Sequence, residues 1–212
     1  MSDAYHKSRF THDTRRDVLW ETLWSSWFSR FIRAEDTVLD LGAGYGNFIN
    51  TVVASRRIAL DSWPGFAGHL APGVEAICSS VTDLSAIADS SIDFALASNL
   101  FEHLTREELA LVLSQLRTKL SARGALTILQ PNFRYASAEY FDDYTHLTAW
   151  SHVSLADFLT ANGFTVVDIH PRFLPLTVKS GLPVWPSLIR LYLRLPVRPF
   201  GKQMLIRARA SG

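Results

Sequence analysis

The sequence predicts an α/β protein in which helices cover both faces of a doubly wound, mostly parallel sheet. Short apolar segments with strand character alternate with segments of helical periodicity, the order that produces parallel strands joined by crossover helices. A glycine-rich turn follows the first of these strands at residues 42–46, where the backbone can approach a ligand closely. The chain has 212 residues, of which 48% are hydrophobic, and this is enough to bury a substantial core.

The helices and strands are predicted in the following order. An N-terminal helix covers residues 9–33, because tryptophan, leucine and phenylalanine recur there at three- and four-residue spacing. Strands are predicted at residues 37–41, 57–60, 74–78, 92–97, 125–130, 164–170 and 203–209. Further helices are predicted at residues 47–56, 105–120, 154–162 and 187–195. The second of these begins with Thr105 and Glu108 at capping-box spacing.

Three segments depart from this alternation, and we expect all of them to belong to one domain spanning residues 1–212. Residues 1–36 form an N-terminal helical cap. Residues 131–152 are rich in aromatic and ionisable side chains without a regular period, which is typical of a loop that lines a substrate pocket. Residues 173–199 form a basic insert before the last strand, with five prolines and a short apolar helix.

The charge of the chain is unevenly distributed. From residue 171 to the end there are eight basic residues and no acidic one, although the net charge of the whole chain is only +1. A basic end favours an anionic substrate or an anionic membrane surface, and a merely solubilising face is the alternative. For the insert, a lid over the acceptor pocket, a homodimer interface and a peripheral membrane contact all remain open.

The chain has a single cysteine, Cys78, which excludes an intramolecular disulfide and a multi-cysteine zinc site and favours a reducing compartment. The first residues lack the apolar core of a signal peptide. No uninterrupted apolar run approaches the ~20 residues that a membrane-spanning helix needs. We therefore expect a cytoplasmic protein.

An acidic residue lies directly before the glycine-rich turn. Asp40 precedes glycines at positions 42, 44 and 46, and Asp61 follows 21 residues after Asp40, at the end of the second strand. With this pattern the chain resembles the class I S-adenosylmethionine-dependent methyltransferases over about residues 37–209, whereas the third glycine comes too early for a dinucleotide-binding turn. The resemblance implies a seven-stranded Rossmann-like sheet whose last strand is antiparallel. It also implies S-adenosylmethionine as cofactor, bound at Asp40, Gly42, Ala43, Gly44 and Asp61.

The resemblance also implies where the other parts of the cofactor bind. The adenine would lie against Val81, with either Asp83 or Ser80 beside its amino group. Ser98 and Asn99, at the end of the fourth strand, would lie under the methionine part. Arg16, in the first turns of the N-terminal helix, is a candidate partner for the cofactor's carboxylate.

Three further segments resemble methyltransferases encoded in sugar and polysaccharide biosynthesis clusters, namely residues 97–104, 130–135 and 142–147. The resemblance implies O-methylation of a sugar or another small hydroxylated acceptor, or of a glycan. Methylation of a metabolite carboxylate or amine, or cofactor binding without catalysis, are the alternatives. The proline motif of nucleobase-amine methylases is absent after Ser98 and Asn99, so we expect no nucleic-acid partner.

A hydroxyl acceptor must lose a proton, so we expect a general base. His146 is the first candidate because its ordinary pKa suits the role, with Asp143 or Asp142 orienting it. His103, which follows the fourth strand, is the second candidate. We expect no metal site, because the adjacent carboxylates of Asp142 and Asp143 seldom face one ion together.

Overall fold

The computed structural model describes residues 13–175 and 184–211 of the chain. Its centre is one seven-stranded sheet with the strand order β3-β2-β1-β4-β5-β7-β6. All neighbouring pairs are parallel except those of β7, which runs antiparallel to both β5 and β6. The strands are β1 (Thr37–Leu41), β2 (Arg56–Asp61), β3 (Val74–Cys78), β4 (Ile92–Ser98), β5 (Leu120–Pro131), β6 (Phe164–Pro175) and β7 (Gly201–Ala210). The predicted fold class, including the antiparallel last strand, is confirmed.

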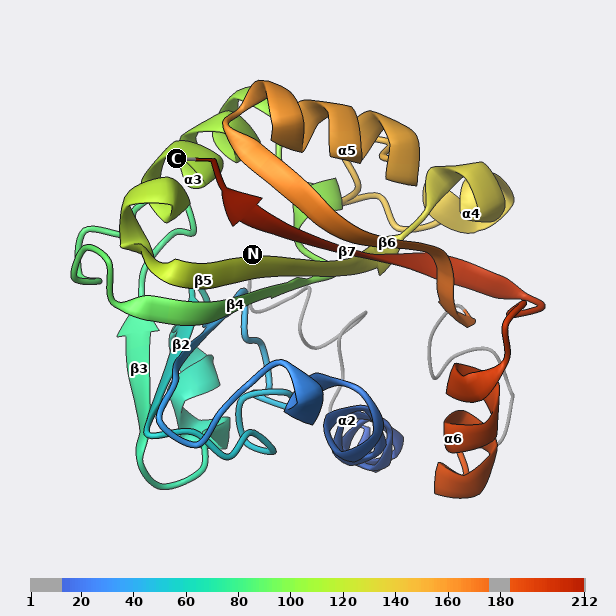
Figure 1. The fold of residues 1–212 in the computed structure, drawn as a ribbon, viewed down its shortest axis with the longest axis horizontal. Helices are drawn as coiled ribbons and strands as arrows, with labels where there is room; N and C mark the ends of the chain where they lie inside the picture. Colours follow the sequence, from blue (N-terminus) through green and yellow to red (C-terminus); the bar gives the residue numbers. More distant parts are fainter. Residues whose placement is uncertain (1–12, 176–183, 212) are drawn as a thin grey trace.

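Helices cover both faces of the sheet, as Figure 1 shows, with α3, α4 and α5 on one face and α2 and α6 on the other. The α-helices are α2 (Thr14–Ser26), α3 (Arg106–Lys119), α4 (Phe133–Tyr140), α5 (His152–Ala161) and α6 (Pro186–Arg194). Three short 3₁₀ helices lie in the connections, η1 (Phe28–Arg30), η2 (Pro64–His69) and η3 (Phe101–His103). The predicted capping box of α3 is present, with Thr105 and Glu108 as its two members.

Each face of the sheet has its own buried core, because successive strand residues point to opposite faces. On β1, Leu39 and Leu41 join the core beneath α3 and α5, whereas Val38 joins the core beneath α2. The α2 core is rich in aromatic rings, among them Phe28, which packs against Phe48. Both cores hold the ends of β1 and β4 in fixed positions.

The predicted helix at residues 47–56 is wrong, because these residues form turns and then lead directly into β2. The N–H of Asn50 donates to the carbonyl oxygen of Gly46, but that of Thr51 already donates to Phe48, three residues back. The Asn50 side chain is bonded to the backbone of His69 and Ala71. The β-branched residues at 49 and 51–53 also have low helix propensity, so the segment stays irregular.

Other boundaries differ in smaller ways. The N-terminal helix ends at Ser26 rather than near residue 33, and the predicted positions 9–12 lie outside the described residues. Residues 131–152, expected to be irregular, contain α4, whose first turn is capped by the side chain of Asn132. In the insert, α6 matches the predicted helix to within one residue at each end, and residues 176–183 lie outside the described part.

Candidate active site

The glycine-rich turn lies where β1 ends. The N–H groups of Gly42 and Ala43 donate to the carbonyl oxygen of Leu60 on β2, at 2.8 and 3.1 Å. Gly42, Gly44 and Gly46 have φ angles of +68°, +54° and +70°, a left-handed conformation that favours glycine. A Cβ atom at Gly42 would lie 3.0 Å from the Leu100 side chain, so the turn and the loop after β4 are in close contact.

Asp61 closes this turn from the end of β2. Its Oδ2 accepts the N–H of Gly44 and its Oδ1 accepts the N–H of Trp63, both at 2.8 Å. The side chain is fixed by these two bonds, and each carboxylate oxygen can accept a further hydrogen bond. A rigid carboxylate beside a glycine turn fits the two neighbouring hydroxyls of a ribose.

Asp40 lies beneath the same turn and is buried. Burial, reinforced by the nearby Asp61 charge, raises the pKa of Asp40 to about 8, although the N–H of Ile49 donates to its carboxyl group. Asp40 is therefore largely protonated at neutral pH, which limits repulsion between the two carboxyl groups. Its place in the site is that of a buried support for the turn.

The start of α2 lies beside the glycine-rich turn. This is the part of the chain that holds Arg16, the predicted partner of the cofactor's carboxylate. The Asn47 side chain donates to Asp17, the residue after Arg16, at 2.7 Å. A depression of about 320 Å³ lies between α2 and the turn, and Tyr45 and His69 are among its lining residues. Arg16 itself is half-buried.

The two candidates for the adenine site remain open. Val81 is buried in the core beneath α3 and α5. Asp83 is exposed and accepts the N–H of Ser85, which lowers the pKa of its carboxyl. The Ser80 hydroxyl is exposed and bonded to that of Thr82 at 2.7 Å.

At the end of β4, Asn99 has a left-handed backbone with φ of +49°. Its N–H donates to the carbonyl oxygen of Leu129 on β5, and its side-chain oxygen accepts the Gln203 amide of β7 at 3.0 Å. Its amide group donates to the Ser98 hydroxyl at 3.2 Å. These bonds fix the strand end where the methionine part of the cofactor was predicted to bind.

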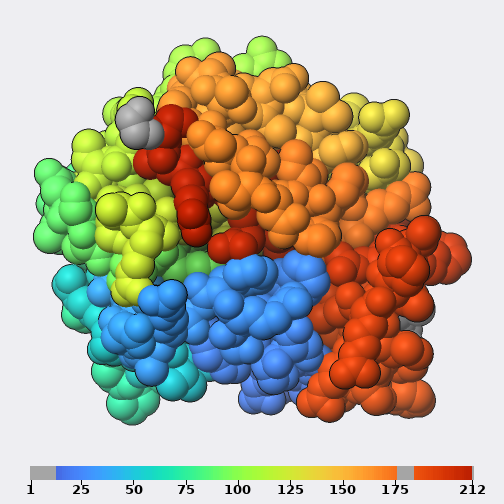
Figure 2. Space-filling view, in the orientation of Figure 1, coloured from blue at the N-terminus to red at the C-terminus, as the bar shows by residue number. Residues whose placement is uncertain are grey.

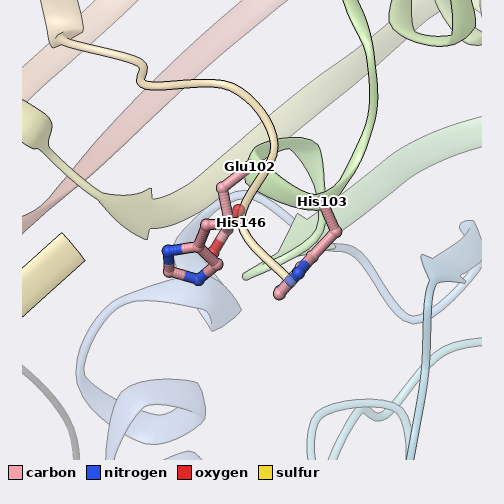
Figure 3. A group of neighbouring side chains, drawn as sticks. All are labelled: Glu102, His103 and His146. Atoms are coloured by element: carbon pink, nitrogen blue, oxygen red, sulfur yellow. The ribbon is translucent and has the colours of Figure 1, made fainter. Parts of the chain in front are cut away.

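Just beyond this point, Glu102, His103 and His146 come together (Figure 3). One potential ligand atom of each residue lies within 4.8 Å of those of the other two. The first two belong to η3, and His146 comes from the segment after α4, so the loop predicted to face the acceptor folds back onto the end of β4. The two predicted catalytic histidines are thus neighbours, with ring centroids 4.8 Å apart.

The hydrogen bonds of the two rings define their protonation. His146 Nδ1 lies 2.5 Å from the carbonyl oxygen of Tyr140, and His103 Nδ1 lies 3.2 Å from that of Thr145. A carbonyl oxygen only accepts, so both Nδ1 atoms carry a proton and donate it. In the neutral rings the lone pairs are therefore on Nε2.

Asp143 lies close to both rings. We expected Asp143 or Asp142 to orient His146; the Nδ1 of His146 donates to the backbone of Tyr140, and the Asp143 charge opposes the lowering of the His146 pKa by burial. Asp143 Oδ1 accepts the Thr145 hydroxyl at 2.6 Å, and this hydroxyl oxygen lies 3.0 Å from His103 Nδ1. The carboxylate thus reaches His103 through Thr145. Asp142 is exposed.

Both rings favour the neutral form. Burial, together with the neighbouring His146, lowers the pKa of His103 to about 4. Burial also lowers the pKa of His146, against the opposing effect of its bond to Tyr140. A neutral imidazole has one ring nitrogen with a lone pair, which can accept a proton or bind a cation.

Glu102 is the main residue of the site that sequence reasoning did not assign. Its side chain is 0% exposed, and neither carboxylate oxygen has a hydrogen-bond partner among the described residues. Burial raises the pKa of Glu102 to about 8. The available signal was its position directly before His103, in a segment that was otherwise noted only for its resemblance.

Comparison with known proteins identifies the class. A methyltransferase-domain family matches residues 14–169, so the chain belongs to this methyltransferase family. A search of curated proteins gives no match.

Solved structures share the fold. A SAM-dependent methyltransferase from Archaeoglobus fulgidus is 22% identical, with 97% of each chain covered and a TM-score of 0.70. An S-adenosylmethionine-dependent methyltransferase from Mesorhizobium loti is 15% identical over 89% of this chain and 97% of that one, with a TM-score of 0.66. A complex between the Haloferax volcanii Trm112 methyltransferase activator and a candidate methyltransferase also contains a similar chain. The sequence identity is 18%, with 99% of this chain and 97% of that chain covered and a TM-score of 0.70.

Among the described residues, no helix is both long and apolar enough to cross a membrane.

Proposed function

We propose that this methyltransferase transfers the methyl group of S-adenosylmethionine to a hydroxyl group of a sugar or another small hydroxylated acceptor. The observation that carries the proposal is the pair of neutral imidazoles, His103 and His146, just beyond the end of β4. Leu100, which contacts the glycine turn, precedes His103 by only three residues. Groups that can take up a proton therefore lie close to the predicted cofactor site.

The cofactor fits the residues at the ends of β1 and β2. Asp61 would bind the ribose hydroxyls, and the backbone of Gly42, Ala43 and Gly44 would follow the methionine part. Ser98 and Asn99 would lie below it, Arg16 would pair with its carboxylate, and Val81 with Asp83 or Ser80 would bind the adenine. When bound, S-adenosylmethionine supplies a methyl group that its sulfonium already activates.

The protein's remaining task is to hold the acceptor and to remove its proton, because an oriented reactant pair reacts much faster than a free one. His146 is the proposed base, since its Nε2 lone pair is free of the Tyr140 bond. Asp143 supports the neighbouring ring of His103 through Thr145. A base with a lowered pKa stays unprotonated at neutral pH and is ready to accept the proton.

The two histidines favour a hydroxyl over a carboxylate. A metabolite carboxylate is already ionised at neutral pH and needs no base, whereas a hydroxyl must lose a proton; an alkyl amine is protonated at this pH and also needs a base, so the substrate test below separates it from a hydroxyl. The sequence resemblance of residues 130–135 and 142–147 supports a sugar or a glycan. An inactive cofactor-binding protein would have no need of a proton acceptor at this point.

The surface of α6 supports a further part of the proposal, contact with an anionic membrane surface. Trp185, Leu188 and Leu191 are 62%, 42% and 59% exposed and follow one another at helical spacing. Arg190 and Arg194 lie on the same helix, whose inner side packs on α2 through Leu193. Figure 2 shows α6 on the outer surface of the molecule. An exposed apolar stripe beside arginines is typical of interfacial helices and fits a lipid-linked acceptor.

The proposal is tested by measuring S-adenosylhomocysteine formation with nucleotide sugars, glycans, lipid-linked sugars and phenols. Each hydroxylated compound is paired with a carboxylate and an amine analogue of similar size. Turnover confined to hydroxylated compounds is the expected result. Turnover only on amines or carboxylates would overturn the hydroxyl assignment, and cofactor binding without turnover on any of them would favour a non-catalytic role.

A further inference from the structure

Glu102, His103 and His146 form a set of metal-ligating groups that has not been assigned a metal. Two imidazole nitrogens and one carboxylate oxygen approach within 4.8 Å of one another, which leaves room for one ion between them (Figure 3). We expected no metal site from the sequence because Asp142 and Asp143 were the carboxylates that could have served as ligands beside the histidines. The structure brings Glu102 to the histidines instead.

The state of Glu102 points to a missing ligand. Its side chain is completely buried, and neither carboxylate oxygen has a hydrogen-bond partner among residues 13–175 and 184–211. Burying a carboxyl group without a partner costs several kcal/mol, and buried polar groups are nearly always paired (roughly 90% or more). A cation between the histidines would supply the absent partner.

The histidines are oriented as metal ligands usually are. A metal-bound histidine normally donates its second ring N–H to a backbone carbonyl or a carboxylate, which fixes the ring. His146 donates Nδ1–H to Tyr140, and His103 donates Nδ1–H towards Thr145, which is itself bonded to Asp143. The bond to Tyr140 holds His146 in the tautomer that has its lone pair on Nε2, and the bonds of His103 Nδ1 hold that ring in place beside it.

We infer that Glu102, His103 and His146 bind one divalent first-row transition-metal ion. Imidazole ligands suit ions such as Zn²⁺, Fe²⁺ or Ni²⁺, whereas Mg²⁺ and Mn²⁺ prefer oxygen ligands. The inference rests on the proposed function and changes one step of it. With its ring nitrogen bound to the ion, His146 acts as a metal ligand, and the ion rather than His146 activates the acceptor hydroxyl.

Three protein ligands leave coordination positions open for a substrate oxygen. An acceptor hydroxyl bound there has a lowered pKa, so its proton leaves to solvent. The oxygen then forms the bond to the methyl carbon as the bond from that carbon to sulfur breaks.

Metal binding is measured directly on the full chain after treatment with a chelator. Co²⁺ is titrated as a coloured probe, followed by competition with Zn²⁺, Mn²⁺ and Mg²⁺. We expect one Co²⁺ per chain, displaced by Zn²⁺ more readily than by Mg²⁺, and at least tenfold weaker binding in Glu102→Gln and in His146→Asn. The control His170→Gln removes a histidine that lies beside Asp168 outside the cluster, and should bind as the wild type does.

Several results overturn the inference. Absence of Co²⁺ absorption in the wild type does so, and so does equal binding by the wild type and a folded cluster variant. Glu102→Gln replaces a buried carboxyl by a neutral group of the same shape. If Glu102→Gln does not fold, the Co²⁺ affinity of His146→Asn decides whether the cluster binds the ion. Calorimetry with S-adenosylhomocysteine separates the two proposals. Binding of S-adenosylhomocysteine without binding of Co²⁺ refutes only the metal site. Binding of Co²⁺ without binding of S-adenosylhomocysteine refutes the proposed function.

Discussion

The proposed cofactor side and the proposed acceptor side of the site are built differently. Around Gly42 and Gly44 the site consists mostly of backbone, shaped by three left-handed glycines and held by one carboxylate, Asp61. On the acceptor side it consists of side chains, Glu102, His103 and His146, that approach from separate segments. The first arrangement suits one constant ligand. The second can change with the acceptor by replacing a few side chains, which is why the cofactor is easier to assign than the acceptor.

The largest expected effect is a loss of turnover when a residue of the proposed acceptor side alone is replaced. His146→Ala should reduce turnover by about 10²–10⁴-fold, because it removes the proposed base or, if the cluster holds an ion, one ligand of the ion that activates the acceptor. The affinity for S-adenosylhomocysteine should stay within about twofold, as His146 lies outside the glycine turn. Both are measured on the same preparation, with His170→Ala as the control. Unchanged turnover would remove His146 from the mechanism.

The next effect breaks the cofactor side. Asp61→Ala should weaken S-adenosylhomocysteine binding by roughly 30–100-fold, because charge-assisted bonds to the ribose and the bond to Gly44 are both lost. Isothermal calorimetry measures it, and Asp89→Ala, which removes an exposed carboxylate, is the control. If both variants bind equally well, Asp61 does not contact the cofactor.

Replacing Asp40 tests the proposed cofactor side through the pH dependence of the free energy of unfolding. Its pKa is raised from 3.8 to about 8 on folding, so its stabilising contribution is complete below about pH 4 and is lost as the pH rises towards 8. Asp40→Asn removes this loss, and the variant should gain roughly 2–5 kcal/mol relative to the wild type between pH 4 and pH 8. Urea unfolding of both proteins across this range measures the difference. Parallel curves would mean that Asp40 is ionised in the folded protein.

The smallest effect extends the comparison to the exposed surface of α6. Leu191→Ser should weaken sedimentation with vesicles containing anionic lipid by about three- to tenfold, and Arg190→Gln should do so by about fivefold at low salt. Leu111→Ser, an exposed leucine of α3, is the matched control. Equal binding by all variants, or binding to neutral vesicles alone, would exclude α6 as the contact.

The fold was predictable because its determinants are local. Alternating apolar segments define the strands, and the capping box of Thr105 and Glu108 marks the start of α3. The one helix that was wrong, at residues 47–56, shows the limit of local reasoning. One helical hydrogen bond forms there, from the N–H of Asn50 to Gly46, but the next N–H donates to Phe48 instead, and the Asn50 side chain bonds to the backbone 19 and 21 positions further along.

The same distinction explains how much of the site was predictable. Asp61 and Gly44 are only 17 residues apart, on two successive strand ends, and their pairing follows from the parallel order. His103 and Thr145 are 42 residues apart and meet only because the segment after α4 folds back. The local signal for Glu102 was only its position directly before His103, because a sequence does not show that a carboxyl is buried without a hydrogen-bond partner among the described residues.

The most direct test of the account is a crystal structure with S-adenosylhomocysteine bound. We predict that the ribose hydroxyls bind Asp61, that the homocysteine part follows Gly42–Gly44, and that the sulfur faces His103 and His146. Density between these histidines and Glu102 would then mark the proposed cation. A nucleoside bound away from Asp61, or a sulfur directed away from the two histidines, would contradict the account.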